Sequence, residues 1–434
     1  MFFIVKDIVV VTRPEVNLLY LTMSKVLVGM SGGVDSSVAA YLLKEKGYEV
    51  EGLSLILWEA KSQKNFTTCC SLQAMEETSK TACQIGIPHS TIDVRDYFTE
   101  KVIEPFIDAY ITGSTPNPCI LCNRYIKFPF LMKEAEKRGA DFIATGHYAR
   151  VEPAQSIEQS ASGGAKIIHN DSIFNVQHST KGNELSNRKH KPHYVLKKGI
   201  DSRKDQSYVL YVLSPEELHK LVLPLGYYRK DEVRNIAEEL NLSAIKRPES
   251  QEICFIEDRN YFKFIDKLSP VAGKPGPIID MTGKMIGMHK GIYGYTVGQR
   301  KGLGISSSKP FYVVKIDAVK NTVYVGSQDD AKKKELFVKD INWIYPLPLL
   351  IPPLSTGDKE GLPKAGVEGC LTLRASIKVR SMMRDKPATI TCHESKRIAH
   401  LVFDEPQWAP APGQSAVFYE GDIVIGGGVI KRSV

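Results

Sequence analysis

The 434-residue sequence contains no apolar run that approaches the roughly 18 residues needed to cross a membrane. Its first apolar stretch is interrupted by Lys6, Asp7 and Arg13, so it resembles neither a signal peptide nor an anchor. The eight cysteines occur without secretory features, which argues against a disulfide framework and favours reduced thiols in a cytosol. These absences predict a cytoplasmic protein that has no membrane partner.

No internal repeat is visible, and the composition is that of an ordinary folded protein, with 43% hydrophobic and 24% charged residues. A chain of this length exceeds one typical core, so it predicts two or three domains. The formal net charge of +8 is compatible with a polyanionic partner without requiring one.

Both common nucleotide-binding signatures, GxxxxGK[ST] and GxGxxG, are also missing. A different glycine-rich turn occupies residues 29–36, between a buried-strand pattern at 25–28 and a helical pattern that includes Val38. Its glycines let the backbone approach a ligand, and the first amides of the helix point outward unpaired at the positive end of the helix dipole. The turn therefore predicts a site for an anionic ligand such as a phosphate.

Strand and helix patterns alternate after this turn. Strands are predicted at 50–58, 87–92 and 141–145, and helices at 72–85, 102–111 and 128–138. This alternation predicts an α/β fold with a doubly wound parallel sheet, whose ligands bind at the carboxyl ends of the strands. The turn at Gly146 and His147 lies at the same end of the sheet as the glycine-rich turn.

The remaining segments differ in composition. We predict an N-terminal extension at 1–22, the α/β domain at 23–214 with a polar insertion at 152–192, a small helical adaptor domain at 215–269, and an all-β barrel at 270–434.

A second chemical signal is the pair Cys119 and Cys122, which follows two prolines, together with the distant Cys254. A zinc site is disfavoured because no second CxxC or CxxH follows at finger-like spacing. Three cysteines are also compatible with an iron-sulfur cluster that leaves one iron open.

The glycine-rich turn resembles the pyrophosphate loop of ATPases that adenylate their substrates. Nearly the whole chain from Met23 onward resembles the tRNA-specific 2-thiouridylases, through GMSGGVDSSV, TPNPCILCN, ATGHY, KDQSY, ICFI, TVGQRKGLGI and PGQSAVFYEGDIVIGGG. The resemblance implies a tRNA-uridine 2-sulfurtransferase that uses ATP and Mg²⁺ to adenylate the 2-oxygen of the wobble uridine and then transfers sulfur from a cysteine persulfide. It also implies an anticodon-loop substrate, a sulfur-donor protein as partner, and a monomer.

The resemblance further implies the roles of individual residues. Cys254 carries the persulfide and Cys122 resolves it. The residues implied to bind ATP are Gly29, Met30, Ser31, Gly32, Gly33, Val34, Asp35, Ser36, Leu55 and Gly146, with Asp35 near the magnesium. The residues implied to contact the target base or the tRNA are Asn117, Pro118, Cys119, Lys204, Asp205, Gln206, Arg380 and Ser381.

Cys119 departs from the pattern, because many similar enzymes carry Asp there. A thiol at this position could share the resolving role or, with Cys122 and Cys254, ligate a cluster. The alternatives are therefore an iron-sulfur-dependent version of the same thiolation, or another adenylating pyrophosphate-loop ligase.

Overall fold

The computed structural model describes residues 24–58, 72–154, 193–246, 253–256, 260–269, 273–345, 370–393 and 397–432. The predicted extension at 1–22 and nearly all of the insertion at 152–192 lie outside these ranges. No helix within them is long and apolar enough to span a membrane.

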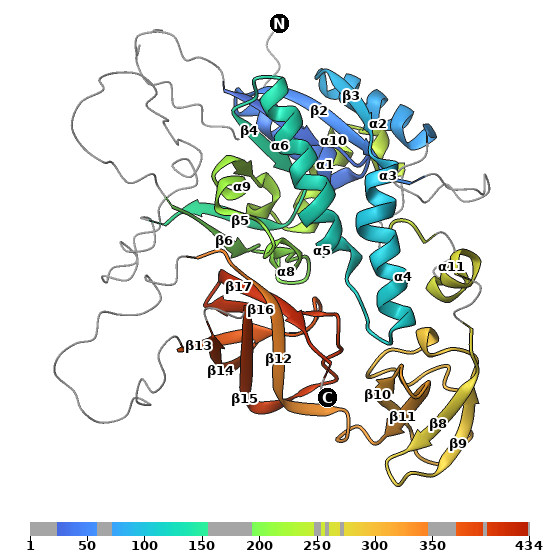
Figure 1. Ribbon diagram of the computed structural model, residues 1–434. Coiled ribbons are helices and arrows are strands. Elements are labelled where there is room, and N and C mark those ends of the chain that lie inside the picture. The colour runs from blue at the N-terminus through green and yellow to red at the C-terminus, as the bar shows by residue number, and fades with distance from the viewer. Residues whose placement is uncertain are drawn as a thin grey trace, which may run out of the picture.

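The first domain is built on a five-stranded parallel sheet, as predicted (Figure 1). Its strand order is β3-β2-β1-β4-β7, with β3 at His89–Asp93, β2 at Glu49–Ile56, β1 at Lys25–Gly29, β4 at Phe142–Thr145 and β7 at Leu221–Val222. Alternate residues of β1 face opposite sides, so Leu27 packs with helix α6 (Phe128–Lys137) and Val26 packs with α1 (Val34–Glu45). Both faces of the sheet are thus covered by helices.

The segment predicted as the start of a helical adaptor belongs instead to this first domain. Strand β7 pairs with β4, and α10 (Lys230–Glu239) packs Val233 and Ala237 against the core formed with α1. The amphipathic pattern of α10 therefore serves the parallel sheet and does not build a core of its own. Helix α11 (Tyr261–Leu268) packs in a different cluster, with residues near the end of β2.

The remaining α- and π-helices of the first domain lie between these strands along the chain, and two 3₁₀-helices, η4 (Pro224–Tyr227) and η5 (Ser243–Lys246), come after β7. The α- and π-helices are α2 (Leu72–Ile85), α3 (Arg95–Phe98), the π-helix η1 (Thr99–Ile103), α4 (Glu104–Ile111), α5 (Pro118–Cys122), the π-helix η2 (Asn123–Lys127), α8 (Ser207–Leu210) and α9 (Pro215–Lys220). Helices α4 and α5 extend from the sheet toward the C-terminal half of the molecule (Figure 1).

The C-terminal half is all β, as predicted, but it contains two separate sheets. A small four-stranded sheet has the order β10-β11-β8-β9, with bounds Tyr312–Asp317, Thr322–Gly326, Gly276–Asp280 and Met285–His289. A closed six-stranded barrel follows, with β12 (Lys332–Trp343), β13 (Cys370–Lys378), β14 (Lys386–His393), β15 (Ile398–Trp408), β16 (Ser415–Glu420) and β17 (Ile423–Ile430). The barrel closes because β12 pairs with both β15 and β17.

A hairpin from the first domain extends the barrel sheet. It is formed by β5 (Ala149–Pro153) and β6 (Tyr194–Lys198), and β6 pairs with β17. Ion pairs from Arg150 to Asp422 at 2.5 Å and from Lys198 to Asp385 at 2.8 Å reinforce this junction. The first domain and the barrel are therefore joined by backbone pairing as well as by side chains.

The barrel also holds the loop that precedes α5. The amide of Thr115 donates to the carbonyl of Pro412 at 2.7 Å, and the Gln414 side chain donates to the carbonyl of Thr115 at 3.0 Å. Between them, Gly413 has a φ of +89°, and a Cβ there would lie 3.1 Å from the Thr115 backbone. We call residues 412–414 the barrel clamp.

We predict that Gly413→Ala destabilises the protein more than Gly421→Ala. Both glycines have positive φ, which costs an alanine about 1 to 2 kcal/mol. A Cβ at Gly421 meets nothing within 4 Å, whereas overpacking at Gly413 adds about 1 to 3 kcal/mol. Urea unfolding followed by fluorescence measures the difference, and equal midpoints for the two variants would contradict a tight clamp.

Candidate functional site

The glycine-rich turn joins the end of β1 to the start of α1 and is held by its own serines. The Ser36 hydroxyl donates to the carbonyl of Gly33 at 3.1 Å and accepts from the amide of Ser31 at 3.2 Å. Gly32 has a φ of +76°, and the N-cap Gly33 has no side chain to occupy the first amides of α1. The turn is therefore preorganised as a cradle for an anion.

Strand β4 ends directly against this cradle. A Cβ on Gly146 would lie 2.7 Å from the carbonyl carbon of Asp35 and from the amide nitrogen of Ser36, so only glycine fits there. The next residue, His147, accepts or donates a 2.8 Å hydrogen bond with the Thr145 hydroxyl, and burial holds the pKa of this imidazole well below its ordinary value. The sequence predicts that Gly146 and the glycine-rich turn lie at the same end of the sheet, and in the structure they are in direct contact.

A cation that the sequence analysis missed completes the cradle. Lys230, the first residue of α10, is buried and places its Nζ 2.7 Å from Oδ1 of Asp35. The Tyr148 hydroxyl donates to the same oxygen at 2.7 Å. The turn itself contains no lysine, so Lys230 supplies positive charge at its edge from a distant part of the chain. No sequence signal could have marked it, because only the packing of α10 on α1 brings it there.

The two neighbouring thiols lie on helix α5. Asn117 caps this helix by accepting from the amide of Cys119 at 3.1 Å. Cys119 is exposed, whereas Cys122 is buried, with 7% of its surface accessible. The helix continues through the π-helical turn η2 into α6, and such turns occur frequently at functional sites.

The segment that carries Cys254 packs on the same apolar cluster as Cys122. Phe255 anchors this segment, with ring centroids 5.7 Å from Phe98 and 5.3 Å from Phe106. Leu55, near the end of β2, also packs against this cluster. We call it the thiol cluster; its other buried members are Val94, Val102, Ile103, Tyr110, Ile126, Ile256, Ile265 and Tyr293. The structure thus gathers Cys122, Cys254 and Leu55 around one core.

Burial raises the pKa of Cys122 to about 11, and the positive charge of Lys127 opposes this rise only in part. The Cys122 thiol is therefore protonated near neutral pH in this structure. Because the thiolate is the nucleophile, Cys122 reacts only when its surroundings change or its proton is taken up by a neighbour.

A metal centre on these cysteines does not fit the geometry. Within the described ranges, no three His, Cys, Asp or Glu side chains are grouped closely enough to hold a metal ion. Cys119, Cys122 and Cys254 are accordingly not arranged as cluster ligands. The single carboxylate of Asp35 suits Mg²⁺, which commonly takes one or two carboxylates together with substrate phosphates.

Comparison with known proteins agrees with this arrangement. Family models match residues 24–258 as a "tRNA methyl transferase HUP domain", 263–327 as a "tRNA methyl transferase PRC-barrel domain" and 333–430 as an "Aminomethyltransferase beta-barrel domain". The chain is 41% identical over 411 residues to the tRNA-specific 2-thiouridylase MnmA of Clostridioides difficile (strain 630), covering 94% of this chain and 99% of the relative. The tRNA-specific 2-thiouridylase MnmA 2 of Thermoanaerobacter sp. (strain X514) is 42% identical over 414 residues, covering 95% of this chain and 99% of the relative.

The chain belongs to the tRNA-specific 2-thiouridylase family. Among solved structures, a 4-thiouridine synthetase in complex with RNA and ATP aligns with 57% of this chain and 50% of its own, at 16% identity and a TM-score of 0.29. That overlap is too small to inform the site of a 2-thiouridylase.

The residues of the KDQSY segment have mainly internal contacts in this 2-thiouridylase fold. Asp205 accepts from the amides of Gly199 and Ser207 and pairs with Lys378 at 3.4 Å. The Gln206 side chain accepts from the amide of Tyr148 at 2.9 Å. These bonds brace the chain between the cradle and the barrel, and the tRNA contacts of Lys204, Asp205 and Gln206 stay predictions.

Arg380 likewise joins two parts of the C-terminal half. Its guanidinium donates to the carbonyls of Val297, beside the four-stranded sheet, and Ala409, at the end of the barrel strand β15. Burial lowers the pKa of this side chain from its ordinary value. The neighbouring Ser381 is half-buried. The tRNA contacts proposed for these two residues also stay predictions.

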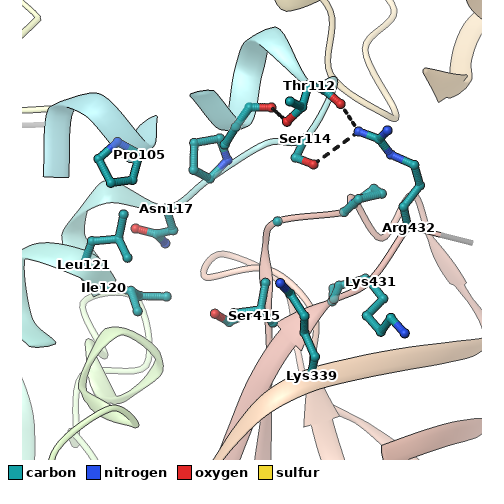
Figure 2. A pocket seen from close by; sticks show the side chains of 16 residues that line it. Pro105, Thr112, Ser114, Asn117, Ile120, Leu121, Lys339, Ser415, Lys431 and Arg432 are labelled. Carbon is teal, nitrogen blue, oxygen red and sulfur yellow. Dashed lines mark hydrogen bonds between the residues drawn. The ribbon is translucent and has the colours of Figure 1, made fainter. Parts of the chain in front are cut away.

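A groove of about 610 Å³ runs between helices α4 and α5 and the barrel. Figure 2 shows Asn117, Ile120 and Leu121 on one wall and Lys339 and Lys431 opposite. The cysteines of α5 do not line it. Leu121 of α5 lines the groove and also packs against the thiol cluster, so the two features adjoin along this helix.

The wall of this groove is tied across the domain junction by Arg432, which donates to the carbonyl of Thr112 and, at 3.5 Å, to the hydroxyl of Ser114 (Figure 2). This contact and the barrel clamp hold the same loop. The start of α5 is therefore positioned by the barrel as well as by its own domain.

We predict that iodoacetamide labels Cys122 slowly at neutral pH. With a pKa of about 11, its thiolate fraction rises about 100-fold between about pH 7 and pH 9. Mass spectrometry of the labelled peptides measures this rise, with the exposed Cys83 as the internal control. Labelling of Cys122 as rapid as that of Cys83 at pH 7 would show that the thiol is accessible and ionised.

Proposed function

We propose that this protein replaces the 2-oxygen of the wobble uridine of tRNA with sulfur, using ATP. The observation that carries the proposal is the combination of an anion cradle with two thiols, Cys122 and Cys254, on one apolar cluster. Its curated relatives are named 2-thiouridylases. The family models are named for methyl transfer, a reaction that requires neither a phosphate cradle nor a thiol pair.

The first step activates a poor leaving group. The uridine 2-oxygen attacks the α-phosphorus of ATP, pyrophosphate leaves, and the oxygen carries AMP. We propose that the amides at the start of α1 and the ammonium of Lys230, which is buried beside Asp35, neutralise the charge of the departing pyrophosphate. Asp35 would hold the Mg²⁺ ion, which supplies further positive charge to the phosphates.

The second step transfers sulfur. The terminal sulfur of a persulfide on Cys254 attacks carbon 2 of the adenylated uridine. The Cys122 thiolate then attacks Sγ of Cys254, which breaks the persulfide S–S bond and forms a Cys122–Cys254 disulfide, while AMP leaves with the former 2-oxygen. The loaded enzyme therefore gives up its outer sulfur at the sulfide level, the Cys122 thiol is oxidised in its place, and the turnover ends with a Cys122–Cys254 disulfide.

We propose tRNA as the substrate because the relatives are named tRNA-specific 2-thiouridylases. An anticodon-loop base is unpaired, so extruding it costs less than flipping a base from a duplex. We propose that a sulfur-donor protein loads Cys254, that the enzyme acts as a cytoplasmic monomer, and that its affinity for tRNA falls steeply with salt.

We expect Cys254→Ser to abolish formation of 2-thiouridine while leaving ATP binding intact, because serine cannot carry a persulfide. The assay is mass spectrometry of nucleosides after incubation with ATP, a sulfur donor and unmodified tRNA. Cys83→Ser is the matched control, since Cys83 is exposed on α2, outside the thiol cluster. An unchanged yield of 2-thiouridine with Cys254→Ser would refute the persulfide role. A wild-type reaction that yields no 2-thiouridine would refute the proposed function.

We expect Lys230→Gln to slow tRNA-dependent pyrophosphate release by about 10²- to 10³-fold, because one preorganised charge at the phosphates is lost. Lys133→Gln, which changes an exposed lysine on α6, serves as the control for charge and folding. Thermal unfolding of both variants checks that the domain is intact. A rate for Lys230→Gln within twofold of the control would exclude Lys230 from the phosphate site.

A further inference from the structure

The carboxylate of Asp35 is held through its oxygen Oδ1. The Tyr148 hydroxyl and the Lys230 ammonium both donate to this atom, each at 2.7 Å. Among the residues that the structure describes, none forms a hydrogen bond or an ion pair with the other oxygen, Oδ2. The Asp35 side chain is 36% exposed, so a ligand from outside the chain can reach this carboxylate.

The first donor, Tyr148, is fixed in place without the help of Asp35. Its amide donates to Oε1 of Gln206 at 2.9 Å, and its carbonyl accepts from the amide of Gln206 at 2.8 Å. A Cβ on Gly199 would lie 2.8 Å from the same carbonyl oxygen, so the backbones are closely packed there. The Tyr148 ring is buried in the core cluster that includes residues of α1 and α10. The hydroxyl therefore has a set position before any ligand binds.

The second donor, Lys230, is fixed by a different route. Its amide donates to Oδ2 of the buried Asp201 at 3.2 Å, which anchors the first residue of α10. Its Nζ then reaches Asp35 from α10, whereas the Tyr148 hydroxyl comes from the segment that follows β4. Two separately anchored donors thus converge on one oxygen of Asp35.

This arrangement leaves one oxygen of Asp35 for a metal ion that also binds phosphates. Mg²⁺ requires near-ideal octahedral geometry and usually binds one or two carboxylates together with substrate phosphates. Groups that hydrogen-bond to a ligating carboxylate orient it, and their loss weakens metal binding. Because Oδ1 already accepts from two donors, Oδ2 is the oxygen that is available to the ion.

We propose that Tyr148 is a positioning residue, which holds Asp35 by Oδ1 so that Oδ2 is presented to the Mg²⁺ that accompanies ATP. This inference rests on the use of ATP and Mg²⁺ in the proposed function. Tyr148 acts through Asp35 and not on the phosphates. Its loss therefore reduces what Mg²⁺ contributes to ATP binding, and it leaves the binding of metal-free ATP unchanged. Lys230 differs, because its charge also serves the phosphates in the proposed reaction.

The test separates the metal from the nucleotide. Calorimetry measures the dissociation constant of ATP in EDTA and in saturating Mg²⁺, with the full chain and no tRNA, and the ratio of the two constants reports the coupling between ion and ATP. In Tyr148→Phe this ratio should fall about tenfold or more, while the constant in EDTA stays within about twofold of wild type. Tyr48→Phe is the matched control, because Tyr48 packs in the same core cluster beyond the far end of α1, and it should leave both constants unchanged.

A double-mutant cycle with Asp35→Asn tests whether Tyr148 acts through Asp35. In the Asp35→Asn background, Tyr148→Phe should no longer change the ratio. An equal fall in both backgrounds, or an unchanged ratio in Tyr148→Phe alone, would overturn the positioning role. Equally weaker binding in EDTA and in Mg²⁺ would assign Tyr148 to the stability of the cradle, which also overturns it. Because calorimetry needs no tRNA, these failures are distinct from that of the proposed function, which is refuted by a wild type that forms no 2-thiouridine.

Discussion

The close approach of Gly146 to the backbone of Asp35 and Ser36 is the constraint on which the site depends. It fixes the end of β4 against the start of α1 with no room for a side chain. Two residues later, Tyr148 bonds to Asp35 through its hydroxyl and to Gln206 through its backbone. The chain then enters β5, whose hairpin joins the barrel. One contact at the cradle thus sets the path of the backbone as far as the C-terminal domain.

The parts of the fold that could be predicted are those whose sequence pattern reports burial directly. Buried parallel strands such as β1 and amphipathic helices such as α6 have continuous or periodic apolar residues. Strand β7 contains only two residues, and β12 begins with three lysines and a glutamate that face solvent, so neither gives such a pattern. The hairpin of β5 and β6 is divided by the long polar segment, which hides its pairing from the sequence.

The candidate site was predictable to the extent that its chemistry resides in motifs. The glycine-rich turn and the thiol pair could be identified because their residue types and spacing are unusual. Lys230 could not, because its role follows from the packing of two helices that are distant in sequence. Asp205, Gln206 and Arg380 are predicted RNA contacts, and within the chain their polar groups also bind backbone and buried partners; their contacts with tRNA stay predictions. A polar or charged residue in a motif can stabilise the fold as readily as it can bind a ligand.

The barrel clamp gives the anion cradle and helix α5 different mechanical supports. The cradle is anchored within the parallel sheet, whereas the loop that leads into α5 is held by hydrogen bonds to Pro412 and Gln414 on the barrel. A ligand bound to the barrel would therefore meet two paths toward the site, one through this loop to α5 and one through Lys378 and the β5–β6 hairpin to the chain beside the cradle. The sheet and the barrel constrain the site jointly.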